Sequence, residues 1–219
     1  MVGGVRFPSR LRSVLVVTLA VLLAGHAAHA SLITSNLGES TNSYVDLDVA
    51  DWFAASFTTD GQTYTFTQVT LDMADAGAAG GNFVVSLRAD NSGVPAGSSL
   101  TGLSGSAAPT SAGQYAYTGT YSLAANTTYW VVAGVSSGSG DYRWNFTDSF
   151  AQTGPGSIGD EYGFSGDQGT SWTTPGSGPQ KLSVEGTPTG VPEPSSVVLF
   201  ACALAGGALR SGRTARQTS

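Results

Sequence analysis

Hydrophobic and polar residues alternate along much of the chain between residues 31 and 186. In SYVDLDVA, residues 43–50, Val45, Leu47 and Val49 fall on one side of an extended chain, and the aspartates fall on the other. This period of two predicts a strand with one buried and one solvated face. Comparable segments follow at intervals of about 8–15 residues, separated by stretches rich in Gly, Ser and Asn, so we expect about ten short strands.

Three segments carry more detailed predictions. WFAASFTT and QTYTFTQVTLDM flank Asp60-Gly61, a dipeptide that favours a β-hairpin turn. The hydrophobic residues of the second segment change from even to odd positions, which predicts a bulge near Thr67-Gln68. TTYWVVAGV is hydrophobic on both faces, as a central strand is. We expect Asn126 to turn the chain before it, and Tyr129 and Trp130 to project to opposite faces of the sheet.

Together these segments predict an all-β chain with one domain, an antiparallel β-sandwich of the jelly-roll type, over residues 31–186. A Pro-containing linker follows over residues 187–194. Hydrophobic segments at the two ends of the chain predict a signal-peptide helix before the sandwich and a short hydrophobic helix after the linker.

Residues 1–30 have the order of a secretory signal peptide. Three arginines precede an apolar run over residues 14–24, and the small-residue motif Ala28-His29-Ala30 follows. We therefore expect cleavage between Ala30 and Ser31 and export of the chain that follows.

A second apolar run, residues 195–209, is followed by a basic tail, residues 210–219. As a helix, these fifteen residues span roughly 22 Å, which is less than the ~30 Å hydrocarbon core of a bilayer. Local thinning of the bilayer can close this gap, and positive charges hold the tail in the cytoplasm. The run therefore predicts a transient inner-membrane anchor that ends in the basic residues Arg210, Arg213 and Arg216.

A Pro-Glu-Pro motif lies directly before the anchor. The order of Val191, Pro192, Glu193 and Pro194, then the apolar run, then arginines, resembles the PEP-CTERM sorting signal of Gram-negative bacteria that make extracellular polysaccharide. The resemblance implies processing by exosortase, a membrane transpeptidase-like enzyme that cuts near this motif. The arginines are spread out here rather than contiguous. An ordinary C-terminal anchor is the alternative.

Segments of the body resemble the choice-of-anchor R family of bacterial surface ectodomains. They are LITSNLG, ASFTTDGQTYTFTQVTLDM, VSLRADNSGVPAGSSL and LAANTTYWVVAGV. The resemblance implies a sandwich fold and a C-terminal anchor. It implies no catalytic residues, because the family is defined by architecture and anchoring.

The body between the two terminal signals is acidic and lacks two kinds of reactive side chain. Residues 31–190 hold three basic and fourteen acidic residues, a formal charge of −11, which disfavours nucleic acid and anionic lipid as partners. The same segment has no Cys and no His, because Cys202, His26 and His29 lie in the terminal signals. This excludes a disulfide, a Ser-His-Asp or Cys-His nucleophile and a His or Cys metal site within the body.

The acidic residues suggest a weak calcium candidate. Asp46, Asp48 and Asp51 supply the hard oxygen ligands that Ca²⁺ prefers, but the spacing lacks the glycine and terminal glutamate of an EF-hand. A solvated strand face is the preferred interpretation. Asp160-Glu161 and Asp167, in a Gly-rich stretch, form a second candidate of the same kind. We expect no metal and no cofactor.

The aromatic residues suggest a sugar-binding candidate. An indole ring can stack on the C–H face of a sugar, although most of the aromatic residues lie at positions expected in the core. Trp172, in DQGTSWTTPGSG, is the tryptophan least expected in the core and is therefore the candidate for an exposed, ligand-binding ring.

These observations favour a non-enzymatic protein that is exported to the cell surface or extracellular matrix of a Gram-negative bacterium. Exosortase is the expected processing partner, and secreted exopolysaccharide is a further candidate partner. The alternative function is a carbohydrate-binding, lectin-like module for that polysaccharide. A secreted hydrolase is a third class, since glycosidases need only two carboxylates, but no motif favours it.

Overall fold

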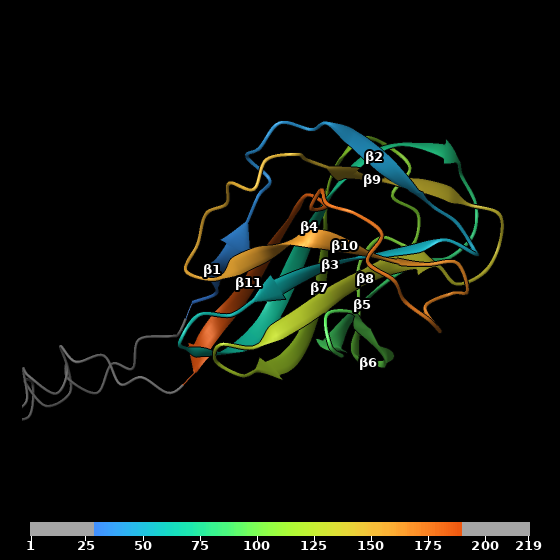
Figure 1. Ribbon diagram of the computed structural model, residues 1–219. Helices are drawn as coiled ribbons and strands as arrows, with labels where there is room; N and C mark the ends of the chain where they lie inside the picture. The colour runs from blue at the N-terminus through green and yellow to red at the C-terminus, as the bar shows by residue number, and fades with distance from the viewer. Residues whose placement is uncertain (1–28, 190–219) are drawn as a thin grey trace, which may run out of the picture.

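The computed structural model describes residues 29–189, and this part of the chain consists of strands and loops without a helix. It contains eleven strands (Figure 1): β1 (Ser31–Ser35), β2 (Ser43–Leu47), β3 (Trp52–Thr58), β4 (Thr63–Ala78), β5 (Phe83–Asp90), β6 (Pro95–Leu103), β7 (Gly113–Leu123), β8 (Thr128–Val135), β9 (Asp141–Phe146), β10 (Ser157–Ser165) and β11 (Leu182–Thr189). The predicted all-β fold is confirmed. The predicted terminal helices and the sorting motif lie outside the described residues, and no helix within residues 29–189 is long and apolar enough to cross a membrane.

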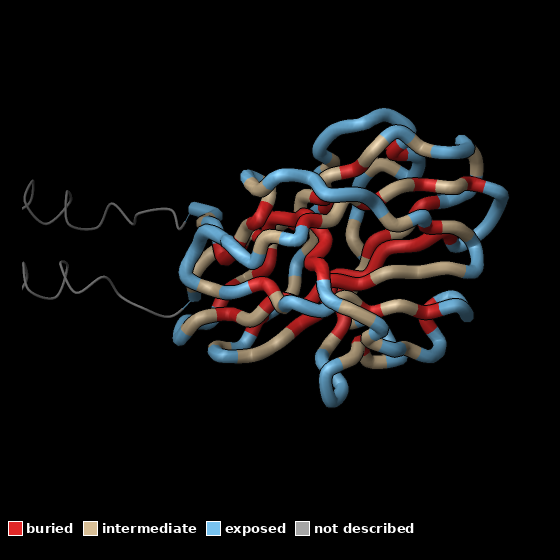
Figure 2. The backbone as a smooth tube through the Cα atoms, turned by 45° about the horizontal axis from the view of Figure 1, so that its top comes forward, coloured by how far each residue is buried: buried red, intermediate tan, exposed pale blue. Residues whose placement is uncertain are grey.

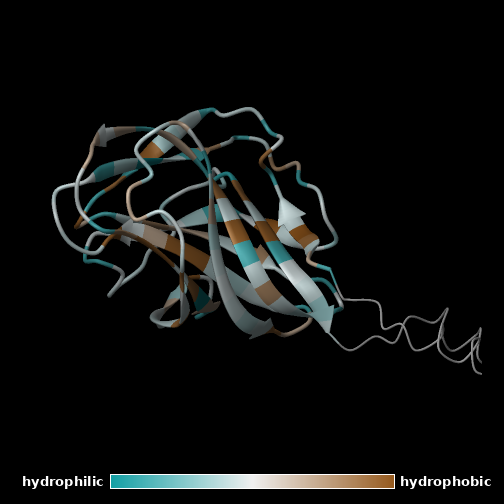
Figure 3. Cartoon of the chain, turned by 180° about the vertical axis from the view of Figure 1, so that it is seen from behind, coloured by the Kyte–Doolittle hydropathy of each residue, from teal (hydrophilic) through white to brown (hydrophobic). Residues whose placement is uncertain are grey.

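The strands form two antiparallel sheets. One has six strands in the order β1-β11-β4-β9-β2, with β7 paired to the other edge of β4, and the second has five in the order β10-β3-β8-β5-β6. Hydrophobic and hydrophilic bands alternate along several strands in Figure 3, as the period of two predicts. Each sheet therefore has a hydrophobic face to bury.

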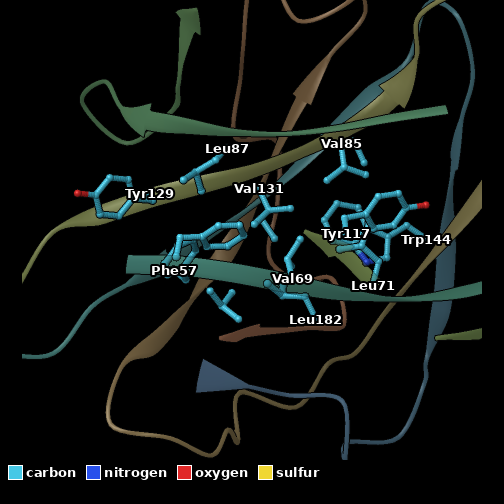
Figure 4. Close-up of a cluster of buried hydrophobic side chains, with 14 of the residues drawn as sticks. Phe57, Val69, Leu71, Val85, Leu87, Tyr117, Tyr129, Val131, Trp144 and Leu182 are labelled. Atoms are coloured by element: carbon cyan, nitrogen blue, oxygen red, sulfur yellow. The ribbon is translucent and has the colours of Figure 1, made fainter. Parts of the chain in front are cut away.

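The hydrophobic faces of the two sheets meet in one large core (Figures 2 and 4). Leu71 and Trp144 from the six-stranded sheet and Leu87 and Val131 from the five-stranded sheet are all fully buried. Aromatic rings fill the space near Phe83, whose ring centroid lies 5.2 Å from that of Tyr142 in an edge-to-face arrangement. Burial of this kind is the main source of stability in a domain without disulfides.

Two detailed predictions are confirmed. β8 lies in the centre of the five-stranded sheet, between β3 and β5, and each of its residues after the first is buried. The register of β4 shifts between Phe66 and Gln68 against β7, and β11 shifts opposite the same place, so a bulge lies at Thr67. The bulge moves the buried residues of β4 from Tyr64 and Phe66 to Val69 and Leu71.

The predicted hairpin at Asp60-Gly61 is wrong. β3 and β4 belong to different sheets, so the turn carries the chain across the sandwich instead of pairing the two strands. Asp60-Gly61 does form a turn, in which the Asp60 carboxylate accepts hydrogen bonds from the Gln62 backbone and from the Tyr64 hydroxyl. The two flanking strands do not pair because Phe57 and Phe66 bury their rings in the core between the sheets. The Asp-Gly dipeptide does not encode this long-range contact.

The six-stranded sheet branches along β4. Residues Thr63–Leu71 of this strand pair with β11, and the later part, from Met73, pairs with β9 on the same side. At the branch, Asp72 N–H donates to Lys181 O (3.1 Å), and Lys181 N–H donates to Asn145 O (2.8 Å). The Trp144 indole N–H also donates to Lys181 O, at 3.0 Å. Lys181 thus connects the ends of β11 and β9 to the middle of β4.

The side chains at the branch form a charged cluster with little solvent exposure. Lys181 Nζ lies 3.2 Å from Asp72 Oδ2, with side-chain exposures of 7% and 16%. Asn145 Nδ2 donates to the same oxygen at 3.0 Å, and Lys181 Nζ donates to Thr41 Oγ1 at 3.0 Å. Each charged group has several partners, which a charge needs when it is withdrawn from water.

We predict that Asp72→Ala lowers the free energy of unfolding by about 3 kcal/mol, because it leaves the Lys181 ammonium without a carboxylate in a poorly solvated position. The matched control is Asp46→Ala, which removes a 3.0 Å pair with Arg143 whose side chains are 29% and 59% exposed. That change is expected to cost less than about 1 kcal/mol. Urea unfolding of both variants measures the difference, and equal losses would contradict a special role for the branch.

Candidate functional site

The first predicted acidic group has structural partners. Asp46 Oδ1 accepts a hydrogen bond from Arg143 Nε at 3.0 Å. Asp48 Oδ1 accepts the backbone N–H groups of Ala50 and Asp51, at 2.7 and 2.8 Å, which forms the turn before β3. Burial raises the pKa of Asp51, and the charge of Asp48 adds to the effect. Within residues 29–189, no three His, Cys, Asp or Glu residues are grouped as a metal site requires.

Asp141, from β9, lies near enough to Asp46 to feel its charge, and no local pattern in the sequence indicated this. Burial, followed by the charge of Asp46, raises its pKa. Asp141 lies at the start of β9, whose pairing with β2 places Arg143 opposite Asp46. Only this long-range pairing brings the acidic residues together, so the local spacing of the sequence could not reveal it.

The second predicted acidic group separates into two parts. Asp160 and Glu161 lie exposed on β10. Asp167 lies in the loop of residues 166–172, which we call the outer loop. Its Oδ1 accepts Ser171 N–H at 2.8 Å and its Oδ2 accepts the Ser171 hydroxyl at 2.6 Å. These bonds, the hydroxyl bond first, lower the pKa of Asp167 to about 2. Asp167 therefore organises the outer loop.

Trp172 lies where the outer loop covers the solvent-side face of the five-stranded sheet. The ring is half-buried and packs on a small cluster of Ala54, Trp130 and Val132. Its indole N–H donates to Gly169 O at 3.1 Å. Trp172 thus holds the loop to the sheet, and a role in ligand binding stays a prediction.

Arg88 is the charged residue under this loop. It is 6% exposed, and its guanidinium carbon lies 5.4 Å from the centroid of the Trp172 ring. Its Nη1 donates to Gly169 O, Ala96 O and Gly97 O at 2.8, 3.1 and 3.2 Å. Burial lowers its pKa. Arg88 therefore ties the outer loop to β6 through backbone carbonyls.

A groove of about 420 Å³ opens between the two sheets at the edge formed by β6 and β7. Leu100 lines it from the five-stranded sheet and Tyr121 from the six-stranded sheet. Asp90 lines it from the end of β5, and Asn126 from the loop before β8. The volume falls within the range of about 300–1,000 Å³ that is usual for small-molecule sites.

The groove was not predicted as a site, although one of its segments was noticed. Asn126 has a left-handed φ of 50°, as expected for a residue that turns the chain. Tyr129 joins the large core and Trp130 the outer cluster, so their predicted projection to opposite faces is confirmed. The sequence did not indicate that Tyr121 and Asp90, from β7 and β5, would meet this loop.

Comparisons of the chain with family models, with curated proteins and with solved structures return no match.

We predict that Asp167→Asn lowers the melting temperature at neutral pH and that this deficit disappears in acid. The ordinary pKa of the group is 3.8, and its value in the folded protein is about 2. The carboxylate therefore stabilises the folded state fully above pH 3.8, and this contribution is lost as the pH falls towards 2. Melting curves of wild type and variant across this range measure it. Asp160→Asn, on exposed β10, is the control, and a deficit that persists unchanged in acid would contradict the role of the charge.

Proposed function

We propose that this chain is an exported, non-catalytic surface or extracellular-matrix protein of a Gram-negative bacterium. Residues 31–189, the span of the described strands, form its β-sandwich ectodomain. Exosortase processes the chain at the motif of residues 191–194 after the transient anchor has stopped in the inner membrane.

One observation carries the proposal. β1 begins at Ser31, the first residue after the expected signal-peptide cleavage, and the described part of β11 runs as far as Thr189, close to Val191. The strands and the two hydrophobic clusters that are described within residues 29–189 therefore lie between the two expected processing sites. We expect this segment to fold without either terminal signal, as an exported domain must.

The start of β1 and the end of β11 lie where a domain tethered to a membrane through its C-terminal segment would need them. β1 and β11 are antiparallel neighbours, with Ser31 opposite Gly186, so the chain enters and leaves the sandwich at the same end (Figure 1). The Ser31 hydroxyl donates to Gly186 O at 3.1 Å. Removal of the leader would therefore leave the new N-terminus fixed beside the strand that continues to the anchor.

We also assign the sandwich to the jelly-roll class, and the strand order supports this. Without β2, β9 and β10, eight strands remain in the sheets β1-β11-β4-β7 and β3-β8-β5-β6. Numbered along the chain, these are first-eighth-third-sixth and second-seventh-fourth-fifth, which is the order of two interlocked Greek keys. β2 and β9 then extend the first sheet, and β10 extends the second.

The distribution of carboxylates supports a non-catalytic domain. Glycoside hydrolysis needs two carboxyl groups that face each other across the substrate. Asp90 is the acidic residue that lines the groove, without a second carboxylate among its lining residues. Asp46, Asp48 and Asp167 bond to an arginine or to turns, as described above.

The proposal predicts that mature protein from the cell surface begins at Ser31, ends near Pro192–Pro194 and lacks Cys202. Replacement of Pro192 and Pro194 by alanine should leave uncut precursor in the inner membrane, because both prolines keep the cleavage segment extended. Mass spectrometry and fractionation measure this.

The matched control is Pro175→Ala, which changes an exposed proline of the ectodomain far from the motif and should leave processing intact. Peptides that cover Cys202 and Arg210 in the bulk of the mature protein would instead indicate an ordinary anchor.

A further inference from the structure

We propose that the groove between β6 and β7 binds a short uncharged saccharide, with Tyr121 as the stacking surface and with Asp90 and Asn126 as hydrogen-bonding groups. This inference goes beyond the proposed function, because it needs neither cleavage nor an anchor. It also places the sugar site away from Trp172.

The groove exists because the two sheets separate at this edge. β6 and β7 are joined by two hydrogen bonds of 2.8 Å between the backbones of Ser104 and Thr118. Beyond this connection, Leu100 of β6 and Tyr121 of β7 both line the groove. The opening is thus a feature of the sandwich edge, with strands rather than loops on two sides.

Stacked aromatic rings fix the wall of the groove. Tyr129 is 6% exposed, and its ring stacks on that of Phe57 with centroids 5.8 Å apart. The Tyr129 hydroxyl accepts the Ala124 N–H at 2.9 Å, so the ring is fixed both by stacking and by a hydrogen bond at its hydroxyl. Tyr121 meets this ring edge to face at 6.3 Å and stays half-buried, with part of its surface in the groove. Tyr121 therefore offers a supported aromatic surface to a ligand.

The loop that carries Asn126 is held in place by the neighbouring turn. Asn126 N–H donates to Asp60 O at 2.7 Å, and Thr127 N–H donates to Thr59 Oγ1 at 3.0 Å. The Thr59 hydroxyl in turn donates to Ala124 O at 2.6 Å. The backbone on both sides of Asn126 is thus fixed while its side chain is exposed, which reduces the ordering cost of binding.

The carboxylate of Asp90 is also positioned before any ligand arrives. Its Oδ1 accepts the Trp130 indole N–H at 2.8 Å, and both oxygens receive the Gly93 N–H, at 3.2 and 3.3 Å. Each carboxylate oxygen has two lone pairs, so Oδ2 keeps acceptor capacity towards solvent. The side chain is exposed at the rim of the groove.

This combination fits a sugar better than an apolar molecule. A pyranose ring has a C–H face that packs on an aromatic ring, and hydroxyl groups around its edge that donate to a carboxylate and pair with an amide. An apolar ligand would cover Asp90 and Asn126 without replacing their hydrogen bonds to water, which is costly.

Charge restricts the class further. Asp90 lines the groove with its carboxylate beside Trp130, on the outer face of the five-stranded sheet, and the body around it carries a formal charge of −11. An anionic sugar would meet repulsion from both. An uncharged saccharide meets no such repulsion, so the groove is expected to bind neutral sugars more tightly than uronic acids.

The test titrates cellobiose, maltose, lactose and diacetylchitobiose into the ¹⁵N-labelled full chain. At least one disaccharide should cause saturable shifts at the amides of Asn126 and Thr127, with a Kd on the order of 1 mM. Digalacturonic acid should bind at least about tenfold more weakly.

Two variants and two controls locate the site. Tyr121→Ala should weaken binding about tenfold, whereas Tyr115→Ala, a half-buried tyrosine on the same strand outside the groove, should not. Asp90→Asn keeps an oxygen for the Trp130 N–H but loses the charge, so it should reduce the preference for neutral sugars. Trp172→Ala should leave the Kd unchanged.

Several results would overturn the proposal. They are the absence of saturable shifts with all four neutral sugars well above millimolar concentration, shifts centred on Trp172, and equal losses in Tyr115→Ala and Tyr121→Ala. Equal binding of digalacturonic acid by the wild type would overturn it as well. If Tyr121→Ala does not fold, the decision falls to Asp90→Asn, which conserves the shape of the side chain. An unchanged preference for neutral sugars in that variant would then overturn the proposal. None of these results bears on export, which mass spectrometry of the processed chain tests separately.

Discussion

The buried ion pair of Lys181 and Asp72 holds together the place where the six-stranded sheet divides. A strand has two edges, yet β4 serves β7 on one side and both β11 and β9 on the other. The two partners on that side must end at the same point, where their terminal backbone groups lose sheet neighbours. The backbone of Lys181 supplies the missing hydrogen bonds to β4 and β9. Its ammonium group lies 3.2 Å from the Asp72 carboxylate. A hydrophobic residue could fill the space but could not pair with Asp72.

The division of β4 determines where the rest of the molecule lies. Before the branch, β4 places β11 and β1 so that both chain ends leave the same end of the sandwich, which suits a tethered domain. After the branch, β9 and β2 carry the Asp46–Arg143 pair. The groove opens at the opposite edge, beside β7, but its Asn126 bonds to Asp60 near the start of β4. A saccharide bound there would lie at the end of the domain from which the proposed anchor segment would leave.

The sequence predicted the local features well because strand periodicity and turn chemistry act over a few residues. The strand of Val131 was recognised as central and the bulge at Thr67 was located from a change of parity alone. Features that depend on distant pairing were missed. In the sequence, Lys181 resembles any surface lysine, and Asp60-Gly61 resembles a hairpin turn until the sheets of its two flanking strands are known. Tyr121 and Asp90 have no local signal, since they meet only when the two sheets pack.

Amide hydrogen exchange under native conditions tests the central role of the branch most directly. The N–H groups of Asp72 and Lys181 donate to Lys181 O and Asn145 O across the branch. If the branch holds the sheet together, these two amides exchange only through global unfolding, with an opening free energy equal to that from urea denaturation. Exchange of either amide through a local opening, as easily as the amides at exposed strand ends, would show that the two halves of the sheet separate without unfolding and would contradict this role.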